Sequence, residues 1–414
     1  MNDKDVKKIA IISTTYPPLG GGGVATAHYN LCCKLKDKGY IVKVFTFYDD
    51  SFADSGHEPT LEDEVLRFGL TAKERKRYNR KLIIRRKIDK WILRKEDDNL
   101  LKFQYNLVLK ALIAAKKINP FLQHFHPDIV FLPSNGASGY VIDKIEDARY
   151  FHICHHNPMQ MIGNPLMTEH SLKDAQKAID IEQKSLSKID VVICVSNYIK
   201  QLFLYTYSFN KRIEVLPNII DNLYIASVQR QNLHHLMNLD ANTPIVYIPS
   251  AGIKSKGEQF VIEIIRRLDH LFQHKIGFYL SGNLSKNQEY ELSFLRNLNI
   301  YVSGDVPNEH NLSYIKDCSL CISPSHTENY SMALMEALFC GLPCVVFNVG
   351  GNGDIVIDDQ TGYIVPYCDM EAMIERSSEI LSSGLLQNQL QQTIRQFTEE
   401  HAAARIIEQY IALF

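Results

Sequence analysis

Short apolar runs alternate with longer stretches of helical periodicity along most of this chain. Apolar runs of this length are typical of strands that are buried on both faces, and their alternation with helices is the pattern of parallel βαβ sheets. The pattern therefore predicts an α/β fold. The expected strands are residues 8–14, 40–47, 127–133, 148–155, 190–196 and 213–218, followed by 244–250, 277–282, 300–304, 319–325 and 343–348.

The series of elements starts twice, because residues 20–39 and 251–268 each follow a strand with a glycine-containing turn and a helix. The polar stretch 221–243 is the natural junction. Two Rossmann-like domains that face each other across a cleft are expected, with ligands at the carboxyl ends of the strands. The predicted domains are residues 1–222 and 223–395, with the helical segment 396–414 crossing back onto the first.

Bulk composition narrows the class of protein. A chain of 414 residues exceeds the usual limit for one hydrophobic core. The composition, 45% hydrophobic and 22% charged, is that of a globular enzyme, and a net charge of −2 argues against a nucleic-acid partner. The N-terminus lacks a signal-peptide pattern, and no apolar run approaches the roughly 18 residues of a membrane span. Nine irregularly spaced cysteines indicate reduced thiols, so a cytoplasmic protein is expected.

Residues 71–95 depart from this average, with twelve Lys or Arg against two acidic residues. Apolar residues recur there near helical spacing, which predicts a helix. One interpretation is a solvated surface helix. The other is a basic amphipathic segment that binds an anionic membrane surface reversibly, most simply the inner face of the cytoplasmic membrane.

Two glutamates, Glu328 and Glu336, frame the start of a predicted helix that begins near Ser331 and stops at Gly341. Helical side chains lean toward the N-terminus, so Glu336 is expected to aim back toward the helix start, which Glu328 approaches from the loop. The N–H groups of Tyr330, Ser331 and Met332 form an anion site at the same place. A ligand whose diphosphate binds these N–H groups and whose two diols donate hydrogen bonds to the two glutamates is a sugar nucleotide. The alternative interpretation is that Glu336 is buried and is held by backbone groups or by a basic partner.

These residues resemble a known family, the retaining glycosyltransferases of family four, which have the GT-B fold and an E-x7-E motif. The resemblance covers almost the whole chain and is of the bacterial cell-envelope type. Its motifs occur in the family's order at residues 16–46, 190–203, 215–221, 256–261, 281–283, 303–307, 324–343 and 350–366.

The resemblance implies roles for residues of the second half. Glu336 would bind the ribose hydroxyls, Glu328 the donor sugar, and Lys256 the phosphate charge that builds up on the leaving group. The donor-binding segment would also include Asn329, Tyr330, Ser331 and Met332. Family members carry an arginine five or six residues before the motif lysine, where this chain has Ala251 and Ser250. Either Lys254 compensates or diphosphate binding is weaker.

In the first half, Gly22 and Gly23 would let the loop approach the donor without a Cβ atom in the way. His156 matches the histidine that the family places near the anomeric carbon, with His155 as the alternative, and His152 is expected in the core. No cofactor or metal is implied, because no Asp-x-Asp motif stands where it would chelate the diphosphate.

The resemblance thus implies transfer of a hexose from a nucleotide-diphosphate donor to a hydroxyl acceptor, with the anomeric configuration retained. The basic segment favours a lipid-linked glycan, a polysaccharide or a lipopolysaccharide precursor as acceptor. A dehydrogenase is a poor alternative, because the loose Gly20-x-Gly22-x-x-Ala25 fingerprint does not follow its strand directly. A sugar phosphorylase or synthase of the same fold and a non-catalytic nucleotide-sugar-binding partner remain alternatives.

Overall fold

The protein forms two compact units in this computed structural model, which describes residues 7–19, 21–93, 103–134, 138–162, 172–295 and 297–414. The first unit comprises residues 1–219 and 406–414, and the second comprises residues 220–405. The last helix, α16 (Ala403–Ile411), therefore returns to the first unit, as the helical C-terminus suggested. The return comes later than residue 396, because α15 (Gly384–Glu400) runs through that position as one continuous helix of the second unit.

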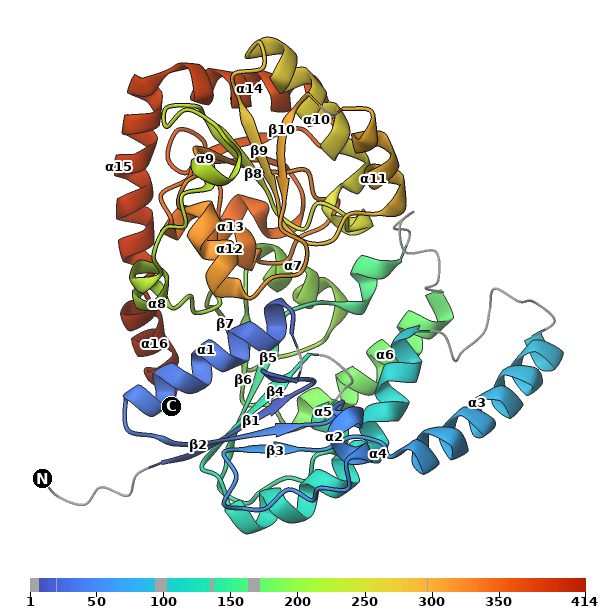
Figure 1. Ribbon diagram of the computed structural model, residues 1–414. Coiled ribbons are helices and arrows are strands. Elements are labelled where there is room, and N and C mark those ends of the chain that lie inside the picture. The colour runs from blue at the N-terminus through green and yellow to red at the C-terminus, as the bar shows by residue number, and fades with distance from the viewer. Residues whose placement is uncertain (1–6, 20, 94–102, 135–137, 163–171, 296) are drawn as a thin grey trace, which may run out of the picture. The chain divides into compact units, whose positions relative to one another are not determined.

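The first unit is built on a seven-stranded sheet in the order β3-β2-β1-β4-β5-β6-β7, and every pairing is parallel (Figure 1). Strands β1, β4, β5 and β6 are buried along nearly their whole length, as their continuous apolar sequences require. The strands are β1 (Lys8–Ser13), β2 (Ile41–Thr46), β3 (Val65–Arg67), β4 (Ile129–Pro133), β5 (Arg149–Cys154), β6 (Val191–Cys194) and β7 (Arg212–Val215).

Helices cover this sheet, and α1 packs against β1 and β2. The C-terminal Phe414 lies against the rings of Phe131 and Phe151 in the sheet, which fixes the end of the chain to the first unit. The helices are α1 (Gly23–Asp37), α2 (Asp50–Asp54), α3 (Ala72–Leu93), α4 (Phe103–Phe125), α5 (Ser138–Val141), α6 (Leu172–Ser185) and α7 (Asn197–Thr206).

The second unit has a six-stranded parallel sheet in the order β10-β9-β8-β11-β12-β13. This is the doubly wound order in which ligands bind where the strand order reverses, here between β8 and β11. The strands are β8 (Ile245–Ile248), β9 (Gly277–Leu280), β10 (Asn299–Val302), β11 (Leu320–Ser323), β12 (Cys344–Phe347) and β13 (Gly362–Val365).

The helices of the second unit include α13, which packs against β11 and β12, and α14, which packs against β11, β12 and β13. Short 3₁₀ turns follow β8 at Lys254–Lys256 and β12 at Gly350–Asp354. Besides α15, the helices of this unit are α8 (Asn222–Ser227), α9 (Leu233–Leu236), α10 (Glu258–Leu271), α11 (Lys286–Ser293), α12 (Asn308–Ile315), α13 (Met332–Phe339) and α14 (Met370–Ser382).

The two parallel sheets confirm the predicted GT-B-type α/β fold, and all eleven expected strands are present. The sequence interpretation did not name β3 and β13, which are short strands at sheet edges. Each of the nine cysteines is a free thiol. Among the described residues, no helix is long and apolar enough to cross a membrane.

Candidate active site

The two loops that follow β8 and β11, on either side of the reversal point of the second sheet, are joined by an ion pair. The ammonium Nζ of Lys256 lies 2.7 Å from Oε1 of Glu328. The Ser325 hydroxyl donates to the same oxygen at 3.0 Å. Glu328 is 7% exposed, whereas the Lys256 side chain keeps about a third of its surface, so this buried carboxylate is satisfied by its neighbours. Both of these bonds go to Oε1.

Two glycines allow these loops to approach so closely. A Cβ atom on Gly257 would lie 2.0 Å from the carbonyl oxygen of Pro324, and one on Gly350 would lie 1.9 Å from that of Glu328. The backbone of Gly351 donates to the same Glu328 oxygen at 2.9 Å. The backbone of Glu328 is therefore held against the turn after β12.

Helix α13 begins directly after this loop, as predicted. The Ser331 hydroxyl caps it by accepting from the N–H of Leu334, and Met332 is its first residue. Asn329 is half-buried, and the buried Tyr330 donates its hydroxyl to Sδ of Met335. The N–H groups of a helix start have no partner within the helix, which makes this end of α13 suited to an anion.

Glu336 lies one turn into α13 and is half-buried. The Nδ2 atom of Asn308, the first residue of α12, donates to its Oε1 at 3.1 Å. Burial of the carboxyl group raises the pKa of Glu336 to about 7, and the Asn308 hydrogen bond acts against that rise. Glu336 thus faces an amide rather than a basic side chain.

The structure also shows what occupies the position of the family's missing arginine. Ala251 is fully buried, and the N–H of Ser250 donates to the Ser281 hydroxyl at 3.2 Å. Lys254 is exposed and forms no ion pair or hydrogen bond through its ammonium within the described ranges. A cation is therefore available two residues before Lys256.

In the first unit, His156 follows β5 near the corresponding reversal point, which lies between β1 and β4. Its Nδ1 lies 3.0 Å from the Ser134 hydroxyl, which also accepts from the N–H groups of His155 and His156. Since these two amides occupy the lone pairs of Ser134, its proton goes to Nδ1, and the ring carries its own proton on Nε2. Burial lowers the pKa of His156 to about 4, so a neutral imidazole presents an N–H donor.

His155 occupies a different environment, buried against His28 of α1, with 3.3 Å between the two Nε2 atoms. The Ser13 hydroxyl donates to the carbonyl of Thr15 and therefore accepts from Nδ1 of His28. Desolvation lowers the pKa of both rings, and both are neutral. His155 thus belongs to a buried pair with His28, and His152 is buried as expected for a core residue.

Gly22 and Gly23 end the loop between β1 and α1. Gly22 has φ of 97° and ψ of 163°, a conformation that is essentially restricted to glycine, and a Cβ atom there would meet no atom within 4 Å. Gly23 is the first residue of α1 and is exposed. The glycine at position 22 serves the backbone shape and leaves open space beside it.

Sequence reasoning missed the side chain that holds the start of this loop. Arg67, at the end of β3, donates to the carbonyl oxygens of Tyr16 at 2.9 Å and Pro17 at 2.5 Å. It is also paired with Asp49 at 2.8 Å, which accepts from the Thr46 hydroxyl, and both charged residues are buried. The start of this loop is therefore fixed by an ion pair between Asp49 and Arg67, two residues that come much later in the sequence than the loop itself.

The residues that the structure describes were compared with the requirements of a metal-binding site. Within the part of the chain that the structure describes, no group of three or more His, Cys, Asp and Glu side chains is arranged to hold an ion. The cations of the second unit's site are the side chains of Lys254 and Lys256.

Comparison with known proteins accounts for both units. The model "Glycosyltransferase Family 4" matches residues 21–222, and "Glycosyl transferases group 1" matches residues 230–397. The chain belongs to these glycosyltransferases. It is 25% identical over 229 residues to an uncharacterized glycosyltransferase of Methanocaldococcus jannaschii, a match that covers 55% of this chain and 60% of the relative's length.

Solved structures agree with this fold. Sucrose-phosphate synthase from Thermosynechococcus elongatus superposes with a TM-score of 0.72 at 18% identity, over 98% of both chains. Anabaena HepE, solved in complex with UDP and glucose, superposes with a TM-score of 0.66 at 14% identity, over 98% of this chain and 99% of HepE. At these identities the likeness establishes the GT-B fold, and each activity belongs to the protein named.

Proposed function

We propose that this glycosyltransferase transfers a hexose from a nucleoside diphosphate sugar to a hydroxyl acceptor, with retention of the anomeric configuration. The observation that carries the proposal is the Lys256–Glu328 pair, at the reversal point of the sheet and directly before the start of α13. It combines a cation, a buried carboxylate and a helix N-terminus, which are the groups that a diphosphate sugar requires.

Each group then has a place on the donor. The diphosphate binds the N–H groups at the start of α13, with Lys256 and Lys254 as its cations. Glu336 accepts hydrogen bonds from the ribose hydroxyls, and Oε2 of Glu328 accepts from a sugar hydroxyl. HepE, which binds UDP and glucose, supports a donor of this class.

In the reaction, the bond between the anomeric carbon and the diphosphate oxygen breaks while the bond to the acceptor oxygen forms on the same face. The acceptor proton passes to the departing diphosphate. Lys256 stabilises the negative charge on that leaving group. In the first unit, His156 presents its Nε2–H as a hydrogen-bond donor, and Gly22 leaves open space beside the end of its loop. No step requires a metal or a cofactor.

The test is release of nucleoside diphosphate from UDP-, GDP- and ADP-hexoses in the presence of candidate acceptors. We expect turnover with one donor and a fall of about 100-fold or more in Glu328→Gln, the scale of losing one preorganised transition-state contact. Glu289→Gln, on the exposed face of α11, is the matched control. Orthophosphate-dependent release of sugar phosphate would instead identify a phosphorylase, and nucleotide binding without turnover a non-catalytic partner.

We further propose that the acceptor is lipid-linked, a precursor of a polysaccharide or lipopolysaccharide, and that α3 brings the enzyme to the cytoplasmic membrane surface. The first turns of α3 are anchored through Arg75, Glu74 and the buried Tyr78. The described basic side chains that follow Arg75 in this helix are exposed and have no acidic partner within the described residues; these are Lys76, Arg77, Arg80, Lys81 and Lys87.

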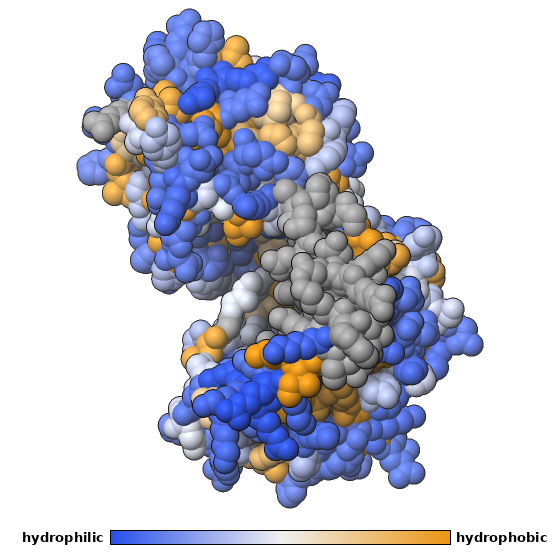
Figure 2. All heavy atoms as spheres, turned by 90° about the vertical axis from the view of Figure 1, so that its right-hand side faces the viewer, coloured by the Kyte–Doolittle hydropathy of each residue, from blue (hydrophilic) through white to orange (hydrophobic). Residues whose placement is uncertain are grey.

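Two exposed isoleucines, Ile83 at 54% and Ile84 at 59%, stand next to these charges. Figure 2, which faces the side where α3 lies, shows strongly hydrophilic and hydrophobic side chains side by side. Basic groups beside exposed apolar ones suit an anionic lipid surface, where each charge contributes about 1 kcal/mol. Residues 94 and 95 of the predicted segment lie outside the described residues.

Liposome flotation tests this docking. Vesicles that contain phosphatidylglycerol should retain the wild-type protein and release an Arg77→Glu, Arg80→Glu, Lys81→Glu variant. A control with the same charge change in the second unit, Arg266→Glu, Lys275→Glu, Lys286→Glu, should stay bound. Equal retention of both variants would exclude α3 as the contact.

A further inference from the structure

A cavity of about 640 Å³ lies wholly within the second unit. Three of its lining residues, Thr243, Ser319 and Leu342, stand just before β8, β11 and β12. They therefore mark the amino ends of these strands, whereas the proposed donor residues follow the carboxyl ends of β8 and β11. The cavity lies at the opposite edge of the sheet and is separate from the proposed donor site.

Basic side chains outnumber acidic ones around this cavity. Its lining includes Arg230, His234, Lys316 and Arg395, against the carboxylate of Asp317. Asp317 is already engaged, since its Oδ2 accepts from the N–H of Leu233 at 2.6 Å and its Oδ1 lies 3.9 Å from Arg230. The cavity therefore has a positive potential that its own acidic group does not cancel.

Two of these basic side chains are committed to the protein itself. The ammonium of Lys316 donates to carbonyl oxygens at the end of α8, including those of Ile225 and Val228. The ring of His234 lies 2.9 Å from the carbonyl oxygen of Thr243 and donates to it through Nε2. Lys316 contributes charge to the cavity, but the donors of both side chains are used.

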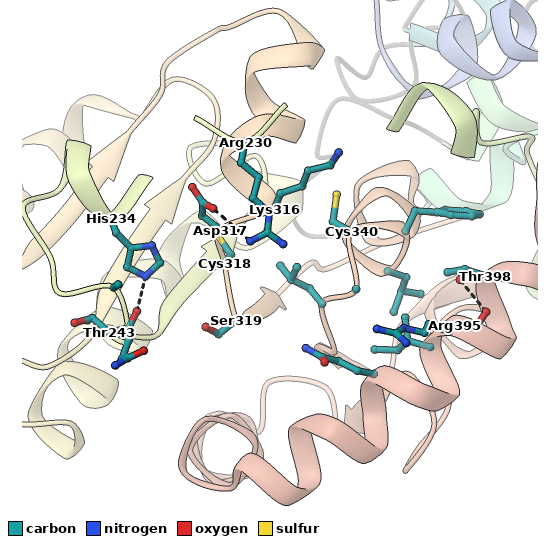
Figure 3. Close-up of a pocket in the computed structure, with 18 residues that line it drawn as sticks. Arg230, His234, Thr243, Lys316, Asp317, Cys318, Ser319, Cys340, Arg395 and Thr398 are labelled. Carbon is teal, nitrogen blue, oxygen red and sulfur yellow. Dashed lines mark hydrogen bonds and ion pairs between the residues drawn. The ribbon is translucent and has the colours of Figure 1, made fainter. Parts of the chain in front are cut away.

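Arg230 and Arg395 keep their donors. Arg230 is largely exposed, and its one ion pair with a residue that the structure describes is the 3.9 Å pair with Asp317. The guanidinium of Arg395, on α15, has no hydrogen bond or ion pair with any residue that the structure describes. Figure 3 shows both side chains directed toward the same space from different sides. Two convergent guanidinium groups form a site for a phosphate, which accepts hydrogen bonds from such forks.

The rest of the lining indicates what the phosphate is attached to. Asn242, Ser319 and Gln391 line the cavity with amides and a hydroxyl that form no side-chain hydrogen bond within the described ranges. Phe339 adds an aromatic ring to the wall. Amides, hydroxyls and an aromatic face are the groups that contact sugar hydroxyls and the apolar face of a sugar ring, and the volume is within the range of small-molecule sites.

We propose that this cavity is a second ligand site that binds a phosphorylated sugar, with Arg230 and Arg395 on the phosphate and Asn242, Ser319 and Gln391 on the hydroxyl groups.

Isothermal titration with glucose 6-phosphate, inorganic phosphate and glucose, at 150 mM KCl, tests the proposal on the full chain. We expect glucose 6-phosphate to bind more tightly than inorganic phosphate, and glucose not to bind. The double variant Arg230→Gln, Arg395→Gln should weaken binding at least tenfold. Arg266→Gln, which removes an exposed arginine of α10 from the same unit, should leave it unchanged.

A competition with saturating UDP separates this site from the donor site. Unchanged affinity for glucose 6-phosphate with UDP present is expected, because the two sites lie at opposite edges of the sheet. The proposal is overturned if glucose 6-phosphate does not bind, if UDP displaces it, or if the double variant binds as well as wild type. Equal affinity for inorganic phosphate and glucose 6-phosphate would overturn the sugar part.

Discussion

The connection from β1 to α1 and the connection from β8 to α10 occupy the same place in the two sheets, yet they are stabilised differently. The first, residues 14–22, is a loop whose start is held by the buried Arg67–Asp49 pair and whose end, at Gly22, lies beside open space. The second, residues 249–257, has the same length, but its Gly257 packs directly on the backbone of Pro324.

The difference shows that a glycine can serve two purposes at equivalent positions. At Gly22 the backbone needs a glycine conformation, but no protein atom lies close enough to exclude a side chain. At Gly257 the neighbouring loop leaves no room for a side chain, because the backbone of Pro324 packs directly on this glycine. The close packing of the two loops brings Lys256 to Glu328. Long-range polar contacts thus fix the first loop, and backbone packing fixes the second.

The largest effect is expected from Arg67→Met. It leaves Asp49 buried with the Thr46 hydroxyl as its one side-chain partner among the described residues, and breaking a buried pair on one side costs about 3–5 kcal/mol. It also removes both donors from the carbonyl oxygens of Tyr16 and Pro17. Urea unfolding and steady-state kinetics should show losses in both stability and kcat/KM.

The double variant Arg67→Met, Asp49→Asn separates these two losses. It removes the unpaired charge, so much of the stability should return, whereas the loop carbonyls stay without their donor and kcat/KM stays low. Full recovery of kcat/KM in the double variant would show that the pair stabilises the fold without positioning the loop.

The next effect compares the glycines themselves. Gly257→Ala places a Cβ atom 2.0 Å from a backbone oxygen in addition to its positive φ, and should destabilise by about 3 kcal/mol. Gly22→Ala meets only the cost of its φ of 97°, about 1–2 kcal/mol, and should lose activity through the displaced loop tip. Gly384→Ala, in open space at the start of α15, is the neutral control. Equal destabilisation by the first two variants would contradict the comparison.

A smaller effect concerns the pH dependence of donor affinity. The pKa of Glu336 is about 7, and the carboxylate rather than the acid accepts from both ribose hydroxyls, so affinity for the nucleotide sugar should rise as pH increases through 7. Asn308→Leu removes the bond that lowers this pKa, so the midpoint should move to higher pH. Glu336→Gln should bind weakly at every pH. Calorimetry between pH 6 and 8.5 would refute the assignment if all three proteins gave the same profile.

Local features could be predicted from the sequence, whereas long-range partners could not. The buried strands, the helix start near Ser331 and the Gly341 stop depend on residues adjacent in the chain, and the structure confirms them. The partner of Glu336 is Asn308, 28 positions earlier, in a segment with no motif that points to it.

The same limit applies in the first unit. Arg67 and Asp49 are 18 positions apart, and nothing in the sequence pairs them before β2 and β3 are aligned. β3 itself is only three residues long, too short to give a periodic signal. The tautomer of His156 depends on Ser134, at the end of a different strand.

The central claim, that the start of α13 binds a nucleotide, is tested most directly by thermal unfolding with UDP, GDP and ADP and with their sugars. At about 100 times its dissociation constant, a ligand adds roughly 2.7 kcal/mol of stability. We predict that one nucleotide raises the melting temperature of the wild-type protein, and that Glu336→Ala abolishes the rise. No shift with any nucleotide, or an undiminished shift in Glu336→Ala, would contradict the account.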